Sequence, residues 1–276
     1  MGRPTPTGGN PGEAGTTGPD VDGAASGSRR PSRRDQRRQE LLADIGTATR
    51  ELVVIDGPPA VTMAAVADRL GVTAPALYRY VNGRTGLLDL ACASVIRELA
   101  AALIAHRDSL GTDPLARALG VCREFRRWSL AHRAECSATF SHRATRFSDP
   151  SATPTAAGDE AVAAQLELAW VIEEALLLLW AARPFDVGHG DDALPERLRA
   201  ALGPYRSQIM ARAVAAGHTL EEPPLGATAV LLDYWTRIYG LVSMEVFGHL
   251  AHAMTDAEPL FEAVLDDLSA LVGQRR

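Results

Sequence analysis

The spacing of the apolar residues is the feature of this sequence that most restricts its fold. From Asp35 onward, leucine, isoleucine and valine recur three or four positions apart, the spacing that places side chains along one face of an α-helix. No segment combines sustained alternation of apolar and polar residues with enrichment in β-branched residues, which is the pattern of a half-buried strand. The sequence therefore predicts an all-α protein.

Caps and helix breakers divide this pattern into segments. A first helix is expected from Asp35 to the Gly57-Pro58-Pro59 stretch, and two short helices follow at 62–70 and 73–82. The apolar stripe of the first helix consists of Leu41, Leu42, Ile45, Ala48, Leu52 and Val53. Longer amphipathic helices are expected at 85–107, 113–133, 157–183, 193–216, 225–252 and 256–272. The expected loops are 140–154 and 185–192.

No apolar run is long enough to span a membrane. The richest stretch, 175–182, falls short of the roughly 18 to 20 apolar residues that a spanning helix needs, and charged residues flank it. The N-terminal residues lack an apolar block followed by a small-residue cleavage site, so no secretory signal is expected. We therefore expect a cytoplasmic protein without a membrane partner.

The chain also lacks the motifs of common enzyme and cofactor sites. Cys92, Cys122 and Cys136 are far apart and form no C-x-x-C pair, which argues against a disulfide framework or a thiolate metal site. No glycine-rich phosphate loop, G-x-S-x-G elbow or H-E-x-x-H motif is present. We expect no enzymatic activity, no metal and no cofactor.

Two groups of residues keep a metal-dependent helical enzyme open as an alternative. His132 and Cys136 share the face of an expected helix, with His142 nearby, but no carboxylate at a suitable spacing would orient them. The second group consists of Glu245, His249 and His252. Its spacing suits a divalent ion, but a solvated or interface face of a helix has the same pattern.

The net charge of −6 conceals an uneven distribution. Residues 29–88 contain ten arginines and six carboxylates, whereas residues 89–276 contain 17 arginines and 25 carboxylates. A basic block on an acidic body suits a protein that approaches a polyanion with one end, and it argues against a DNA-bending protein with basic charge all over its surface. Residues 1–33 are poor in large apolar side chains and are expected to be a disordered tail. The arginines at its end would be either a solvated arm or additional phosphate contacts.

The segment from Thr62 to Tyr80 has a suitable residue at each position of a helix-turn-helix. Thr62 and Thr73 are good N-caps, Pro75 suits a first helical turn, and Gly71 suits a left-handed turn between the helices. The residues expected to point inward are Val66, Leu70, Val72 and Leu77, and Ala67 is small where the two helices would cross. The second of the two helices would present short side chains that let it enter the major groove.

This segment resembles the TetR family of one-component regulators. The resemblance covers roughly residues 36–90 through the stretches TMAAVADRLGV, ALYRYV and LLDL. It implies a three-helix DNA-binding domain with a helix-turn-helix at 34–84, followed by a larger helical-bundle domain for ligand binding and dimerisation at 85–276. The remainder of the chain is similar to the family only in size and helical character.

The resemblance also implies roles for individual residues. Thr62 and Arg84 would contact phosphate, and bases would lie closest to the start of the second short helix. The implied DNA contacts are Thr62, Thr73, Pro75, Ala76, Tyr78, Arg79, Tyr80 and Arg84. Tyr80 stands where the family often has histidine, and Arg84 where it usually has lysine. Both keep a hydrogen-bond donor, although a guanidinium binds as a planar fork and an ammonium as a point charge.

The C-terminal helices contain the candidate ligand and dimer contacts. Aromatic side chains and a few polar groups among residues 121–183 are typical of an apolar small-molecule pocket, and equally of a core. The expected ligand contacts are Phe125, Trp128, His132, Phe140, Trp170, Glu173 and Trp180. The last two helices have wide apolar faces that suit either a two-chain four-helix bundle or ordinary core packing. The expected dimer contacts are Trp235, Tyr239, Val242, Val246, Phe261, Leu265 and Leu268.

These expectations combine into one function. We expect a transcriptional repressor that binds a palindromic double-stranded DNA operator as a homodimer, and that a small apolar or aromatic effector releases from DNA. A transcriptional activator on the same scaffold is the alternative. Repression is favoured over activation only because a bound dimer can block polymerase without further components.

Overall fold

The computed structural model describes residues 32–147, 156–185, 187, 191 and 194–273. All regular structure in these ranges is helical, as the sequence predicted. The elements are α1 (Arg33–Asp56), η1 (Pro58–Ala60), α2 (Met63–Leu70), α3 (Ala74–Leu77), α4 (Gly83–Ser109), α5 (Pro114–Ala131), α6 (Arg133–Phe147), α7 (Ala156–Ala182), α8 (Glu196–Ala215), α9 (Leu225–Val246) and α10 (Glu258–Gly273). The tail expected at 1–33 lies outside the described residues, except for its last two positions.

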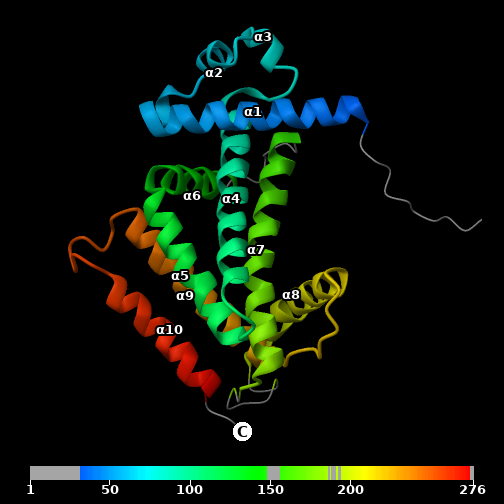
Figure 1. Ribbon diagram of the computed structural model, residues 1–276, viewed down its shortest axis with the longest axis vertical. Helices are drawn as coiled ribbons and strands as arrows, with labels where there is room; N and C mark the ends of the chain where they lie inside the picture. The colour runs from blue at the N-terminus through cyan, green and yellow to red at the C-terminus, as the bar shows by residue number, and fades with distance from the viewer. Residues whose placement is uncertain (1–31, 148–155, 186, 188–190, 192–193, 274–276) are drawn as a thin grey trace, which may run out of the picture.

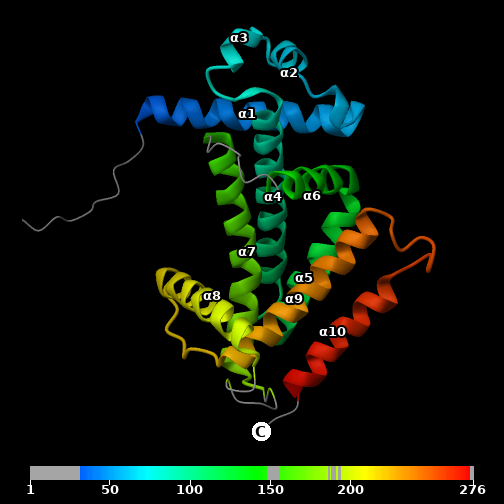
Figure 2. The same ribbon diagram turned by 180° about the vertical axis from the view of Figure 1, so that it is seen from behind.

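The two short helices lie at one end of the molecule. Figures 1 and 2 show α2 and α3 beyond α1, which crosses the molecule, and the remaining helices on the other side of α1. Helices α4 and α7 run side by side from α1 towards the opposite end, where α8 and α10 lie. Any surface formed by α2 and α3 is therefore remote from α8 to α10.

Two apolar cores hold this arrangement together, and α4 belongs to both. The first core joins α1, α2 and α3 to the beginning of α4 and includes Ile45, Val66 and Leu87. The second joins the rest of α4 to α5, α7, α9 and α10, with Leu103 and Phe125 fully buried in it. One continuous helix therefore connects the two cores.

The sequence missed α6. We expected a loop at 140–154, because this stretch is rich in serine, threonine and proline. Instead the chain remains helical to Phe147, with Cys136 buried and Phe140 packed against the second core. Tertiary packing of this apolar face outweighs the local preference. Residues 148–155 of the expected loop lie outside the described part.

Three smaller expectations also need correction. The α9 helix ends at Val246 rather than near residue 252, because Gly248 adopts a φ of +73° and its amide donates to the Glu245 carbonyl, which closes the helix. Regular helix in α3 ends at Leu77 rather than at residue 82, and turns continue from there to Tyr80. Val72 is 38 % exposed instead of buried, because it lies in the turn between α2 and α3.

The described helices include none that is both long and apolar enough to cross a membrane.

Candidate DNA interface and ligand cavity

The turn between α2 and α3 has the geometry of a helix-turn-helix. The Thr62 hydroxyl accepts a hydrogen bond from the Ala65 amide at 3.1 Å and caps α2. Gly71 has a φ of +67°, and the Val72 amide donates to the Ala67 carbonyl at 3.0 Å, which ends α2 and redirects the chain. Thr73 precedes α3 but makes no side-chain cap bond.

Helix α3 turns a face of short side chains towards solvent. Leu77 is buried in the first core and fixes the rotation of the helix. Thr73 and Pro75 are exposed, and Ala76 is half-buried beside them. Short side chains at this position allow the helix backbone to approach the floor of a major groove.

Longer side chains border this face. Tyr78 is 61 % exposed and Arg79 is also exposed, whereas Tyr80 is half-buried against the first core. Beyond α3, the exposed Arg84 donates from Nη2 to the Pro58 carbonyl at 2.7 Å and from Nε to the Val61 carbonyl at 3.2 Å. Arg84 thus holds the turn before α2 in place, a contact that the sequence did not predict.

Basic side chains also cluster at the beginning of α1. Arg33, Arg34, Arg37 and Arg38 lie in its first two turns and are exposed. They form no ion pair with any carboxylate in the described ranges. This charge lies in the same domain as α2 and α3, so an incoming polyanion would meet it together with α3.

Two family models match the chain. The model described as "Bacterial regulatory proteins, tetR family" covers residues 45–91, and that of "Tetracyclin repressor-like, C-terminal domain" covers residues 118–268. The chain belongs to the TetR family. It is therefore a DNA-binding transcriptional regulator, of a class that is not enzymatic.

Individual relatives agree with this family. The chain is 22% identical over 247 residues to the HTH-type transcriptional regulator Rv1816 of Mycobacterium tuberculosis, and equally to its Mycobacterium bovis counterpart Mb1846. In both cases the match covers 89% of this chain and 97% of the relative. The crystal structure of SCO4313, described as a regulatory protein, is 24% identical with a TM-score of 0.56 and covers 87% of this chain and 100% of that one. This last likeness supports the fold of the TetR-family regulator along nearly its whole described length.

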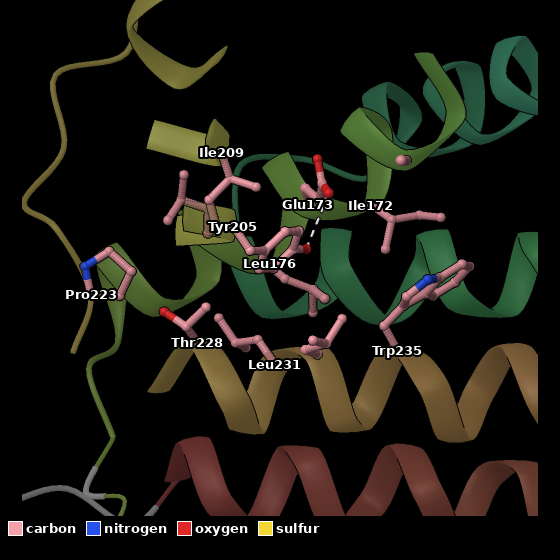
Figure 3. A pocket seen from close by; sticks show the side chains of 12 residues that line it. Ile172, Glu173, Leu176, Tyr205, Ile209, Pro223, Thr228, Leu231 and Trp235 are labelled. Carbon is pink, nitrogen blue, oxygen red and sulfur yellow. Dashed lines mark hydrogen bonds between the residues drawn. The ribbon is translucent and has the colours of Figure 1, made fainter. Parts of the chain in front are cut away.

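The C-terminal domain of the regulator contains a cavity of about 200 Å³ between α7, α8 and α9. We call it the effector cavity. Its lining residues are Ala169, Ile172, Glu173, Leu176, Leu177, Tyr205, Ile209, Pro223, Thr228, Leu231, Leu232 and Trp235. Figure 3 shows Leu176 and Tyr205 pointing into it from one side and Leu231 and Trp235 from α9. Its walls are mostly apolar, which suits a hydrophobic small molecule.

The carboxylate and hydroxyl groups of the effector cavity are already paired. The Tyr205 hydroxyl donates to Glu173 at 3.1 Å, and Arg212 pairs with the other Glu173 oxygen at 2.9 Å (Figure 3 shows the first bond). Burial raises the pKa of Glu173, an effect that Arg212 and Tyr205 partly offset. The Thr228 hydroxyl donates to the Pro224 carbonyl. A molecule bound in this cavity would therefore meet no unpaired charged group, so it need not be charged itself.

The predicted ligand contacts are distributed differently from what the sequence suggested. Glu173 lines the effector cavity. Phe125, Trp128 and Trp180 are buried in the second core, each less than 8 % exposed. Aromatic residues are abundant in cores as well as in pockets, and the sequence alone does not separate the two.

The other three predicted contacts also lie away from the cavity lining. His132 stacks on Trp128 with ring centroids 4.0 Å apart, and the Arg212 guanidinium covers the Trp170 ring at 5.1 Å. Phe140 packs against Tyr239 at 5.4 Å. The sequence missed Tyr205, Ile209 and Leu231, because they come from helices outside the aromatic-rich segment 121–183.

Most of the predicted dimer contacts are used inside the protomer. Trp235 lines the effector cavity, and Tyr239 packs on Phe125 at 6.0 Å. Val242, Val246, Phe261, Leu265 and Leu268 are each at most 3 % exposed in the single chain. Side chains that are already buried have little surface left for a second copy to cover.

The residues that suggested a metal-dependent enzyme have structural roles instead. Burial raises the pKa of the Cys136 thiol to about 12, so the thiol stays protonated at neutral pH and is a poor nucleophile. His132 bonds to a backbone carbonyl, and His142 pairs with Asp89 on α4. Glu245 is bound by Arg126, and α9 ends before His249 and His252, so this triplet does not share a helical face.

Proposed function

We propose that this TetR-family regulator is a homodimeric repressor that binds a palindromic operator and is released from it by a neutral apolar or aromatic effector. The observation that carries the proposal is the exposed, short-residue face of α3, positioned by the buried Leu77 at one end of the molecule. Such a helix is suited to reading bases in the major groove, and two copies would read two half-sites. A bound dimer blocks polymerase without further components.

The proposed DNA contacts divide into base and phosphate contacts. Thr73, Pro75 and Ala76 are nearest to the bases. The proposed backbone contacts are Thr62, Tyr78, Arg79, Tyr80 and Arg84, supplemented by the exposed arginines of α1. Because phosphate contacts release counterions, they set the salt dependence of binding without adding sequence preference.

The effector would act by separating α8 from α7. The cavity of about 200 Å³ is smaller than the roughly 300 to 1,000 Å³ of most ligand pockets, so an effector of ordinary size must enlarge it. The bonds of Glu173 to Tyr205 and Arg212 hold α8 closed on α7. An effector that binds the open form better than the closed form shifts the balance between them.

A chain of contacts leads from this cavity towards the DNA-binding domain. Trp235 packs against Tyr239 at 5.6 Å, and Tyr239 packs against Phe140 of α6 at 5.4 Å. At the other face of α6, Glu135 pairs with Arg50 of α1 at 3.0 Å. A shift of α9 at the cavity therefore reaches α1 through α6, and the spacing of the two α3 helices changes with it.

Operator selection tests the proposal. The full-length protein is incubated with random duplex DNA, and the retained fragments are sequenced and then titrated by fluorescence anisotropy. We expect a retained sequence with two-fold symmetry that binds at least about 10³-fold tighter than random duplex. Equal affinity for retained and random duplex would refute operator recognition. A compound that raises the melting temperature is the effector only if saturating operator weakens its binding, because linkage is reciprocal.

We place the dimer contact on α7 and α8, since five of the seven contacts predicted on α9 and α10 are at most 3 % exposed in the single chain. Val162 and Leu166 of α7 and Leu198 and Val214 of α8 are between 42 and 69 % exposed. The two helices are in contact, as the hydrogen bond from Arg212 of α8 to the Leu166 carbonyl of α7 shows. Their outer surface thus leaves apolar side chains for a second copy.

The dimer contact predicts the effect of charged substitutions. The double variant Leu166→Arg/Val214→Arg buries unpaired charges at the contact and should raise the dimer dissociation constant by about a hundredfold or more. Sedimentation velocity over a concentration series measures the shift. Ile104→Arg, at a 38 % exposed position on α4, is the matched control and should leave the dimer intact. An unchanged dimer in the double variant, with circular dichroism also unchanged, would place the contact elsewhere.

A further inference from the structure

A second cavity lies on another face of α7. It has a volume of about 480 Å³ and is bounded by the end of α4, the beginning of α5, α7 and the segment after α8. We call it the arginine-lined cavity. Glu174 and Leu178 of α7 line it, whereas the neighbouring Glu173 and Leu177 line the effector cavity. The two cavities share no lining residue.

The lining of the arginine-lined cavity divides into apolar side chains and polar groups, the latter including three basic side chains and the Glu174 carboxylate. Ala175, Leu178 and Ala182 of α7 form an apolar strip together with Leu220. Arg107 of α4, Arg117 of α5 and His218 bring basic groups to the same cavity. This division suits a molecule with an apolar body and one charged end.

The carboxylates around the cavity are committed to other partners. Arg107 donates to Glu174 at 2.5 Å, and His218 bonds to the second Glu174 oxygen at 2.7 Å. Asp108 accepts from Arg107 at 3.0 Å. Asp113 caps the Ala116 amide and pairs with Arg183. None of these acids neutralises Arg117.

Arg117 is the cation that this arrangement leaves available. It is half-buried, and its Nε donates to the Gly111 carbonyl at 2.7 Å, which fixes the guanidinium over the Gly111–Thr112 turn. Among residues 32–147, 156–185 and 194–273 it has no ion pair. A guanidinium held in place beside an apolar surface is suited to bidentate binding of a carboxylate.

We propose that the arginine-lined cavity binds an amphipathic organic carboxylate, with the carboxylate on Arg117 and the apolar chain or ring along the α7 strip. This ligand differs in charge from the neutral effector proposed above. It also occupies a separate site, so the two proposals stand independently of each other.

Calorimetric titration of the full-length protein tests the site, with sodium octanoate and sodium naphthoate as the probes. At least one probe should bind saturably at one site per chain. Arg117→Gln should weaken that binding roughly tenfold to hundredfold, the range for loss of a charge-assisted hydrogen bond. Ala182→Trp adds bulk at an exposed lining position and should weaken it as well, without disturbing the core.

Two control variants keep the test specific. Arg197→Gln removes an exposed arginine from α8, and Ala169→Trp obstructs the effector cavity; neither should change the affinity for the probe. Circular dichroism verifies that each variant is folded. The proposal is overturned if neither probe binds saturably, if Arg117→Gln binds the probe as tightly as the parent protein, or if binding is lost in Ala169→Trp.

Discussion

Ala76→Glu should abolish specific operator binding while the protein stays folded and dimeric. The side chain at position 76 lies on the short-residue face of α3, and a carboxylate there would meet base acceptors and the negative potential of the major groove. Loss of specificity should bring the affinity down to that for random duplex, a decrease of about 10³-fold or more. Fluorescence anisotropy with operator and random duplexes measures both values.

The matched control for this change is Ala101→Glu. Ala101 is an exposed alanine on α4 in the C-terminal domain, so the variant has the same net charge and the same chemical substitution. It should bind the operator as the parent protein does, apart from a small decrease through added negative charge. Retention of specific binding by Ala76→Glu would remove α3 from the major groove and contradict the proposed function.

The DNA-binding domain could be predicted from the sequence because its structure depends on local interactions. The cap at Thr62 and the left-handed turn at Gly71 both act within a few residues, and the structure confirms both. The inward stripe of α1, with Ile45 fully buried, follows from helical periodicity in the same way. The same reasoning wrongly predicted that Val72 is buried, because its exposure depends on the angle between α2 and α3.

The C-terminal domain was predicted less completely because its features depend on contacts between remote segments. Helix α6 forms because Cys136 and Phe140 pack against other helices, and their neighbours in the sequence do not favour it. The effector cavity combines α7 with Tyr205 and Leu231, which lie more than 30 positions beyond Glu173 along the chain. Helical periodicity shows that a face is apolar. It does not show whether a core, a cavity or a second subunit covers that face.

The buried ion pair between α5 and α9 illustrates the same point. Arg126 donates to both oxygens of Glu245 at 2.8 Å, and its guanidinium lies 5.4 Å from the Phe261 ring centroid. The Glu245 side chain is only 9% exposed. From the sequence Glu245 had the spacing of a metal ligand, whereas in the structure it joins α5 to α9 beside α10.

Removal of Arg126 should therefore destabilise the protein strongly. Arg126→Ala leaves the Glu245 carboxylate buried without its partner, which typically costs about 3–5 kcal/mol of unfolding free energy. Arg123→Ala is the matched control, since Arg123 on the same helix binds both oxygens of Glu262 but the two side chains are 48% and 33% exposed. It should cost less than about 1 kcal/mol, as is usual for exposed pairs. Urea unfolding at one fixed protein concentration measures both, because the proposed dimerisation would make stability depend on concentration.

A double variant separates the loss of the pair from the loss of packing. Arg126→Met/Glu245→Leu replaces both charges with apolar side chains of similar size, so neither charge remains buried without a partner. It should recover most of the stability lost in Arg126→Ala, because apolar replacement of a complete buried pair is often neutral or stabilising. If Arg126→Ala cost no more than Arg123→Ala, the Arg126–Glu245 pair would be no more important than a surface pair, and α5, α9 and α10 would be held together by their apolar contacts alone.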